Sequence, residues 1–202
     1  MPSTPNPIHD AAASFDNLPG VGPRAALRYA YWLAAQPKDL VLRFARSLDA
    51  LATGVKKCQI CGAWGDVSGC PICNDPKRDQ SALCVVASNQ DIRVIEESGA
   101  FKGRYHVLGG LLDPVEGHTP ETLSIANLIK RLSAPDKQIT EVILALDPDV
   151  AGDTTALYLM KQLAAFPNLN VTRLARGLQN GAQIEYADGT TIADALQNRR
   201  KI

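Results

Sequence analysis

The chain has 202 residues, a formal net charge of +0 and a hydrophobic fraction of 46%, a composition typical of a globular protein with one large domain or two to three small ones. No apolar run approaches the roughly 20 residues that a membrane helix needs, and residues 1–10 lack the apolar core of a secretory signal. We therefore expect no membrane association and a cytoplasmic location. Residues 1–57 are modestly basic, which is compatible with binding to phosphates.

The first part of the chain is predicted to be a short tail followed by helices. The segment 1–14 contains several prolines and polar side chains and is expected to be disordered. Pro23 suits the first position of a helix, and Pro37 precedes a second apolar stripe at helical spacing that ends near Gly54. Residues 15–57 are therefore expected to form a small helical domain.

A glycine-containing turn separates two of these predicted helical segments. Gly20 and Gly22 permit a tight turn whose free amides, together with those of the helix start, favour an anion. Arg24 and Arg28 lie four residues apart and share one helical face beside the turn. This arrangement predicts a helix-hairpin-helix that binds DNA phosphates, although a plain turn with solvated arginines is the alternative. The candidate DNA-binding residues are Gly20, Gly22, Arg24, Arg28 and, as a weaker pair, Lys56 and Lys57.

Four of the five cysteines form two Cys-x-x-Cys pairs: Cys58, Cys61, Cys70 and Cys73. A single pair of this kind could be a disulfide. Two adjacent pairs in a segment with few apolar residues instead predict a four-cysteine zinc finger over residues 58–80, closed around its metal and structural in role. Cys84 lies in the next predicted strand and is expected to be a small buried apolar residue.

The remainder of the chain alternates between strand and helix patterns, which predicts a parallel α/β domain over residues 81–175. Strands are expected at 82–87, 105–108, 141–146 and 170–174, and helices at 91–98, 120–133 and 153–165. Residues 176–202 are predicted to form a strand–helix segment, with a short strand at 184–186 and a final helix near 192–199.

Two carboxylates, Asp147 and Asp149, follow the third predicted strand of this domain. The carboxyl ends of parallel strands are where α/β sheets place their sites, and paired carboxylates can hold Mg²⁺. An Asp-Pro turn followed by a helix N-cap would need no metal. The spacing of the residues leaves both interpretations open.

The order of hairpin, cysteine module, α/β domain and final helix, with its local strings, resembles the RecR family of bacterial recombination mediator proteins. The stretches that carry the resemblance are LPGVGPRAALRYA (18–30), CQICGAWGDVSGCPICNDPKRD (58–79), GRYHVLGGLLDP (103–114), EVILALDPDVAGDTTALYL (141–159) and VTRLARGLQNGAQIEYADGTTIADAL (171–196). Together they extend in order from about Phe15 to the end of the chain.

The resemblance implies a Toprim-type α/β domain and a role without catalysis. Members of the family help to load the RecA recombinase onto single-stranded gaps coated by SSB, together with RecO or RecF. They are similar to a ring-forming clamp whose hairpins line the interior. A homo-oligomer between a dimer and a ring tetramer is therefore expected, with residues 176–202 contributing to its assembly.

The chain departs from the family pattern at two acidic positions, Ala87 and Ala151, where the family usually has Glu. Without a carboxylate at Ala87, proton transfer beside a metal lacks its usual group. We therefore expect no catalytic residues and at most a weak Mg²⁺ site at Asp147 and Asp149. The alternative is a Toprim-type Mg²⁺-dependent nuclease that uses these carboxylates and Asp153. A plain zinc DNA-binding regulator would leave the α/β half unexplained.

Overall fold

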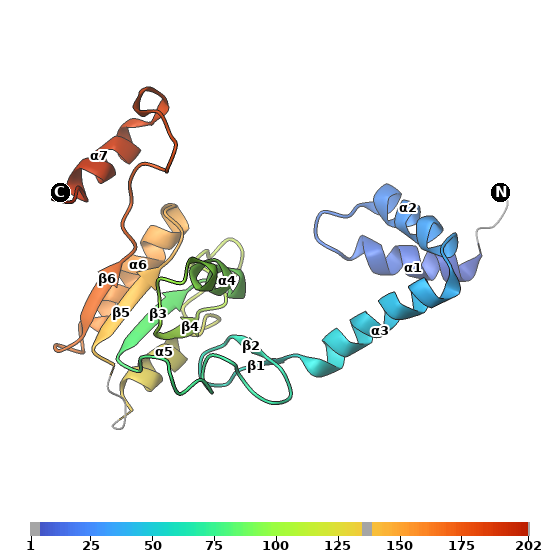
Figure 1. The fold of residues 1–202 in the computed structure, drawn as a ribbon, viewed down its shortest axis with the longest axis horizontal. Helices are drawn as coiled ribbons and strands as arrows, with labels where there is room; N and C mark the ends of the chain where they lie inside the picture. The colour runs from blue at the N-terminus through green and yellow to red at the C-terminus, as the bar shows by residue number, and fades with distance from the viewer. Residues whose placement is uncertain (1–4, 135–138, 202) are drawn as a thin grey trace. The chain divides into compact units, whose positions relative to one another are not determined.

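The computed structural model describes residues 5–134 and 139–201. The chain divides into two compact units, Met1–Val55 and Lys56–Ile202 (Figure 1). In the described residues, no helix combines the length and the apolar character that a membrane crossing requires.

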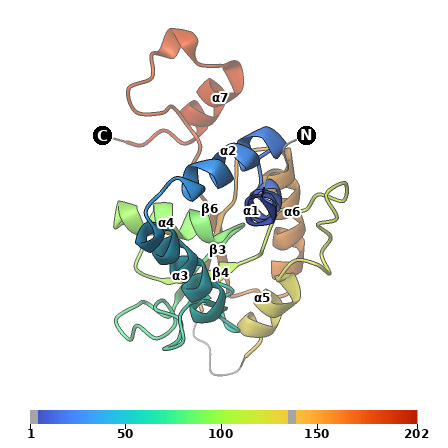
Figure 2. The same ribbon diagram turned by 90° about the vertical axis from the view of Figure 1, so that its right-hand side faces the viewer.

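The first unit consists of helices α1 (Asn6–Asp16), α2 (Pro23–Ala34) and α3 (Lys38–Gly54). Helices α1 and α2 pack side by side (Figures 1 and 2). The ring of Phe15 meets the ring of Tyr29 edge-on, with centroids 6.1 Å apart. On the packed face of α2, Ala26 and Ala30 are buried, and their small side chains let the two helices approach closely.

Helix α1 corrects the prediction of a disordered tail over 1–14, because residues 6–14 are helical. Prolines fit the first turn of a helix, where their missing N–H is not needed. The half-buried side chains of α1 recur at helical spacing: Ile8, Ala11, Ala12 and Phe15. Their packing against α2 stabilises a helix that the local composition alone does not favour.

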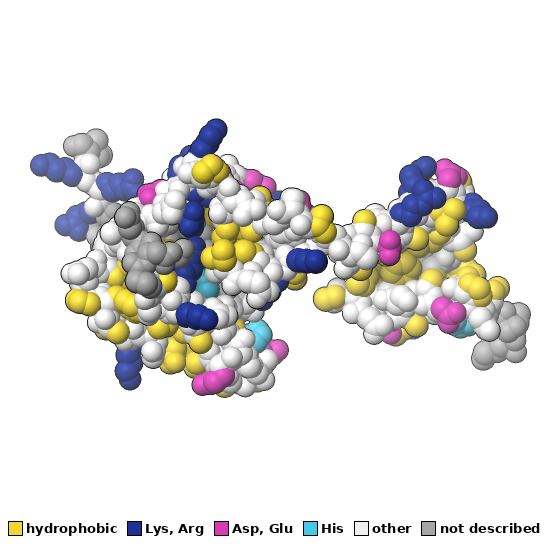
Figure 3. Space-filling view, turned by 90° about the horizontal axis from the view of Figure 1, so that it is seen from below, with side chains coloured by type: hydrophobic (Ala, Val, Ile, Leu, Met, Phe, Trp, Pro, Cys, Tyr) yellow, Lys and Arg dark blue, Asp and Glu magenta, His cyan; other side chains and the backbone are white. Residues whose placement is uncertain are grey.

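The predicted starts of α2 and α3 are confirmed at Pro23 and directly after Pro37. The apolar stripe of α3 is not buried by the other described residues of its own unit. Phe44, Leu48 and Leu51 are all exposed, Leu51 to 60%. Figure 3 shows hydrophobic side chains gathered across this unit, with Lys and Arg side chains to one side of them.

The second unit contains the predicted parallel sheet. Its order is β4-β3-β5-β6, formed by β3 (Ala82–Val86), β4 (Arg104–Val107), β5 (Glu141–Ala145) and β6 (Asn170–Arg173). Val85 of β3 is paired in register with His106 of β4 on one side and with Leu144 of β5 on the other. The strand–helix alternation of the sequence therefore predicted the fold class correctly.

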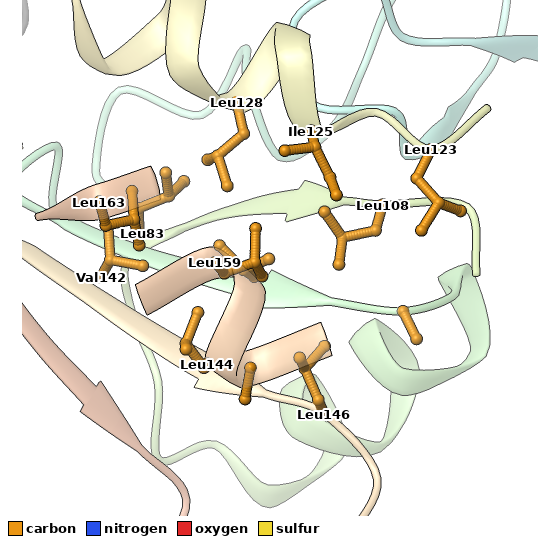
Figure 4. Packing of buried hydrophobic residues seen from close by; sticks show 13 residues of the cluster. Leu83, Leu108, Leu123, Ile125, Leu128, Val142, Leu144, Leu146, Leu159 and Leu163 are labelled. Atoms are coloured by element: carbon orange, nitrogen blue, oxygen red, sulfur yellow. The ribbon is translucent and has the colours of Figure 1, made fainter. Parts of the chain in front are cut away.

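Both faces of the sheet are covered, as expected for parallel strands. Helices α5 (Ile125–Leu132) and α6 (Val150–Leu163) cover the face that carries Leu83 and Val85 (Figures 1 and 4). Helix α4 (Asn89–Ser98) and the cysteine segment cover the opposite face, which carries Cys84 and Val86. Successive residues of β3 therefore enter two different cores, because strand side chains alternate between faces.

Helix boundaries follow local capping. Helix α4 begins at a capping box between Ser88 and Asp91 and ends at Gly99, whose φ is 66°. Helix α5 begins at Ile125, five positions after the expected start at 120, because Thr119 and Thr122 form a turn. In this turn the Thr119 amide donates to Thr122 Oγ1 at 2.9 Å.

The expected strand at 184–186 is wrong, because Ile184–Tyr186 forms a short 3-10 helix. The amide of Tyr186 donates to Gln183 O at 3.1 Å, a local bond that replaces a strand ladder. The exposed fraction of Tyr186 is 81%, so the segment has no apolar face to bury as a strand within the described chain. Helix α7 (Gly189–Gln197) follows and confirms the final helix, with Asp188 as its N-cap.

Enlarging Ala30 tests the packing of α1 on α2. Ala30 is only 3% exposed, and adding bulk to a packed site costs about 1–3 kcal/mol. We expect Ala30→Leu to lower the free energy of unfolding of the full chain by this amount, measured by urea denaturation. Ala34→Leu, on an exposed position of the same helix, is the matched control. If both substitutions lower the free energy of unfolding equally, the packing of Ala30 between α1 and α2 is contradicted.

Candidate metal centre and nucleic-acid interface

The four predicted cysteines lie together. Their sulfur atoms all lie within 4.8 Å of one another. Cys58 Sγ is 3.9 Å from Cys73 Sγ, and Cys61 Sγ is 3.5 Å from Cys70 Sγ. A disulfide would require a sulfur–sulfur distance of about 2.05 Å, and all four thiols are free. The disulfide alternative is therefore excluded in this structure.

The spacing of the sulfur atoms fits a tetrahedral metal site. Zinc–sulfur bonds of about 2.3 Å place the sulfur atoms of a tetrahedron about 3.8 Å apart, close to the observed 3.5 and 3.9 Å. All four ligands come from the protein, which leaves no open position for a substrate. The four cysteines can hold a metal ion in a closed, structural site.

Tight local turns bring the cysteines together. Strands β1 (Lys56–Lys57) and β2 (Trp64–Gly65) pair in antiparallel fashion around the first Cys-x-x-Cys turn. Within the turn, Gly62 has a φ of 75°, which favours glycine, and its amide donates to Cys58 O at 2.9 Å. In the second turn, the amide of Asn74 donates to Cys70 O at 3.0 Å.

Burial and crowding disfavour bare thiolates in this cluster. The hydrogen bond with Cys73 and then burial raise the pKa of Cys61 well above its usual range, and burial raises the pKa of Cys70. A bound divalent cation reverses this preference, because it stabilises the thiolates directly. Cys84 stands apart: it is buried in the sheet, and burial raises its pKa to about 12, as expected of an inert apolar side chain.

The cysteine segment is joined to the sheet and shares its core. The amide of Val107 on β4 donates to Cys61 O at 2.7 Å. Cys61 and Cys70 are buried in the same cluster as Tyr105 and Ile92. The residues predicted as a zinc finger therefore pack directly on the parallel sheet.

A second connection follows the cysteines at Arg78. Its guanidinium donates to Gly103 O at 3.0 Å and forms an ion pair with Glu96 on α4. The hydroxyl of Tyr105 donates to the same carboxylate at 2.6 Å. This polar network ties the end of the cysteine segment to α4 and β4.

Two buried basic side chains beside this region were not predicted from the sequence. His106 Nε2 lies 2.9 Å from Ser124 O, whereas its buried Nδ1 has no hydrogen-bond partner in the described chain. Arg131 on α5 donates to Tyr105 O at 2.6 Å and is buried. The sequence did contain an indication that Arg131 is buried, because this residue falls on the apolar face of α5 that carries Leu128. Only the fold reveals its hydrogen-bond partner.

Two of the three acidic residues that follow β5 have partners within the protein, whereas Asp147 is exposed. Asp149 caps α6 by accepting from the Gly152 amide at 2.7 Å, which confirms the N-cap interpretation for this residue. Asp153 forms ion pairs with Arg173 and Arg176, and these hydrogen bonds lower its pKa. Within residues 5–134 and 139–201, the four cysteines are the only group of three or more potential ligand side chains whose donor atoms gather closely.

The hairpin turn presents open polar groups. Gly20 has a φ of 77°, and apart from the adjacent residues no described heavy atom lies within 4 Å of a Cβ placed at Gly20 or Gly22. Gly22 precedes α2 and provides no side-chain cap, and among the described residues the Ala26 amide already donates to Gly22 O at 3.0 Å; the start of a helix leaves its first backbone N–H groups in need of an acceptor. Arg24 and Arg28 are exposed on this helix. The predicted candidates of the hairpin are thus brought together, whereas exposed Lys56 and Lys57 belong to β1 of the other unit.

The fold and these sites define a modular protein built on a Toprim domain, and comparison with known proteins agrees. Residues 81–175 match the family model of the Toprim domain. Residues 8–52 match the model described as RecR, helix-hairpin-helix, and residues 181–200 match RecR, C-terminal.

Proteins named recombination protein RecR are similar over almost the whole chain. That of Saccharopolyspora erythraea is 44% identical over 97% of this chain and 98% of its own length. That of Synechococcus sp. (strain CC9311) is 46% identical over 93% of this chain and 97% of its own length. The chain belongs to the RecR family of recombination proteins.

Because the imidazole of His106 is buried, we expect the free energy of unfolding to depend on pH in the acidic range. Burial and then the nearby Arg131 lower its pKa from 6.5 to about 4, so the folded chain keeps it neutral. As the pH falls from 6.5 toward 4, the unfolded chain takes up a proton that the folded chain refuses. The associated stability, up to about 3 kcal/mol, is present above this range and is lost as the pH falls through it.

We therefore expect His106→Gln to flatten the pH dependence of the free energy of unfolding between pH 6.5 and 4, measured by urea denaturation. His9→Gln is the control, because His9 is exposed on α1. If the free energy of unfolding of the His106 variant changes with pH as steeply as that of the wild type, other groups cause the loss of stability in acid.

Proposed function

We propose that this protein is a DNA-binding recombination mediator that loads RecA onto SSB-coated single-stranded gaps together with RecO or RecF, without catalysing a reaction itself. The observation that carries the proposal is the hairpin, whose uncapped helix start lies beside two exposed arginines, Arg24 and Arg28. Such groups bind the phosphates of DNA whatever its base sequence. A factor that acts at gaps of any sequence requires binding of this kind.

The proposed contacts to DNA phosphates are the amides around Gly20 and Gly22 and the guanidinium groups of Arg24 and Arg28. Lys56 and Lys57 are exposed and are proposed as secondary contacts. One hairpin of this size offers few charges, so a single chain would bind weakly and with strong dependence on salt.

Weak single contacts favour an assembly of several copies. Linked copies multiply affinity without new contacts, and identical subunits normally form assemblies with closed symmetry. We propose a homo-oligomer between a dimer and a ring tetramer. The exposed apolar side chains of α3 and of residues 176–202, including Leu51 and Tyr186, support it.

We propose that the metal held by Cys58, Cys61, Cys70 and Cys73 is zinc. The sulfur spacing and the all-thiolate ligand set support zinc, and a closed four-cysteine site contributes to folding without taking part in chemistry.

The acidic loop supports a role without catalysis. Asp149 is committed to capping α6, Asp153 is neutralised by two arginines, and position 87 is a buried alanine. Any Mg²⁺ at Asp147 and Asp149 would order the loop for a partner. We propose four functional parts of the chain. They are the hairpin domain, which includes α1 and extends to residue 57, the zinc finger 58–80, the Toprim domain 81–175 and the oligomerisation segment 176–202.

Replacing both hairpin arginines tests the DNA contact. Arg24→Ala with Arg28→Ala should weaken binding to gapped DNA of every sequence and reduce the slope of log affinity against log salt by about 2, because two phosphate contacts are lost. The matched control is Arg43→Ala with Arg46→Ala, two exposed positions on α3 with the same change in charge. If both double variants lose affinity alike, the effect is one of net charge and the hairpin is not the contact.

Metal analysis tests the zinc site. We expect one zinc per chain in the wild type and in Cys84→Ala, whose cysteine lies outside the cluster. Cys70→Ser should lose zinc and unfold at a lower temperature, because a closed tetrahedral site needs all four ligands. Elemental analysis and thermal unfolding give the readouts. Wild-type protein that is purified with reduced cysteines and without zinc would contradict the proposal.

The mediator role is tested by RecA filament growth on SSB-coated gapped DNA. Growth should be faster when this protein and RecO are added together than with either alone, and the hairpin double variant should lose this effect. The same DNA incubated with Mg²⁺ should stay intact. Cleavage that Asp147→Asn abolishes would instead establish a Toprim nuclease.

A further inference from the structure

Arg131 is a buried cation without a carboxylate partner in the described part of the chain. It lies on α5 with 8% of its surface exposed, and its Nη1 donates to Tyr105 O at 2.6 Å. Burying an unpaired charge is costly, so buried cations are normally matched by an anion nearby. A single carbonyl oxygen does not neutralise a guanidinium.

The geometry of β4 places this guanidinium beside the cysteine cluster. Strand β4 is an edge strand, and the groups on its free edge alternate along the chain. The amide of Val107 points to this edge and donates to Cys61 O at 2.7 Å. The carbonyl of Tyr105, two residues earlier, points the same way and accepts from Arg131. Arg131 and the Cys61 turn therefore bind neighbouring groups of one edge.

The electrostatics agree with this placement. Burial lowers the pKa of Arg131, while thiolates at Cys73, Cys61 and Cys58 oppose this effect, so three of the four cysteines lie within electrostatic range of the guanidinium. Four thiolates around one divalent zinc ion leave a net charge of about −2 on the centre. This centre, once formed, is a buried anion in need of a cation.

We propose that Arg131 is the buried counter-charge of the zinc–thiolate centre and strengthens its hold on the metal. The inference rests on the proposed zinc site. Arg131 acts through the ligands rather than by binding zinc, so it is a positioning and charge-balancing residue. It also couples α5, which covers one face of the sheet, to the metal centre on the other face through the edge of β4.

Three substitutions separate charge from packing. Arg131→Gln keeps a donor for Tyr105 O but removes the charge, Arg131→Met removes both, and Arg131→Lys keeps the charge. Lys130→Met is the matched control, because Lys130 is the neighbour on the same helix and is less buried. The measurement is the zinc affinity of the full chain at one fixed pH, by competition with a chromogenic chelator, together with the rate of zinc loss and the free energy of unfolding.

We expect Arg131→Gln and Arg131→Met to hold zinc about tenfold more weakly, a change of about 1.4 kcal/mol, and to lose it faster. Arg131→Lys should stay within about threefold of the wild type, and Lys130→Met should be unchanged. Neutral variants that are less stable but bind zinc as tightly as the wild type would overturn the inference and leave Arg131 a packing residue.

Two further results are decisive. If the neutral variants do not fold, Arg131→Lys carries the test, and a loss of zinc affinity of tenfold or more in this charged variant would overturn the inference. A wild-type chain without zinc would overturn the proposed metal site itself, whereas zinc-loaded wild type with unchanged neutral variants overturns only the role of Arg131.

Discussion

The 2.7 Å hydrogen bond from the Val107 amide to Cys61 O joins the cysteine segment to the edge of the parallel sheet. An uncovered edge strand would leave such groups unpaired and open to association with other chains. Here the edge of β4 is occupied by the Cys61 turn and by Arg131. Cys61 and Cys70 also belong to the core beneath α4, so the cysteine cluster and the sheet share one set of buried contacts.

Charge is balanced within the chain at both ends of this sheet. At the carboxyl end, Arg173 and Arg176 pair with Asp153 in the first turn of α6. At the edge of β4, Arg131 donates to Tyr105 O, and Arg78 pairs with Glu96. Of the acidic residues after β5, Asp149 caps α6 and Asp153 is ion-paired, whereas Asp147 is exposed.

The hairpin unit is packed differently. Its buried residues are small, such as Ala26 and Ala30, while the apolar stripe of α3 remains exposed. A helical stripe in a sequence says that one face of a helix is apolar, but it does not say which surface covers this face. The same holds for residues 184–186, whose apolar side chains face solvent within the single chain.

The sequence by itself determined the cysteine pairs, the hairpin turn, the order of strands and helices and the family, because these depend on spacing along the chain. It underestimated α1, whose prolines and short apolar stripe become helical only against α2, and it made a strand of residues 184–186, which have no ladder to join. The tertiary structure alone decided that Asp153 pairs with Arg173 and Arg176 and that Arg131 binds Tyr105 O on the same edge of β4 as the Cys61 turn. Both depend on contacts between residues far apart in the sequence, and hydrophobic periodicity carries no information about such partners.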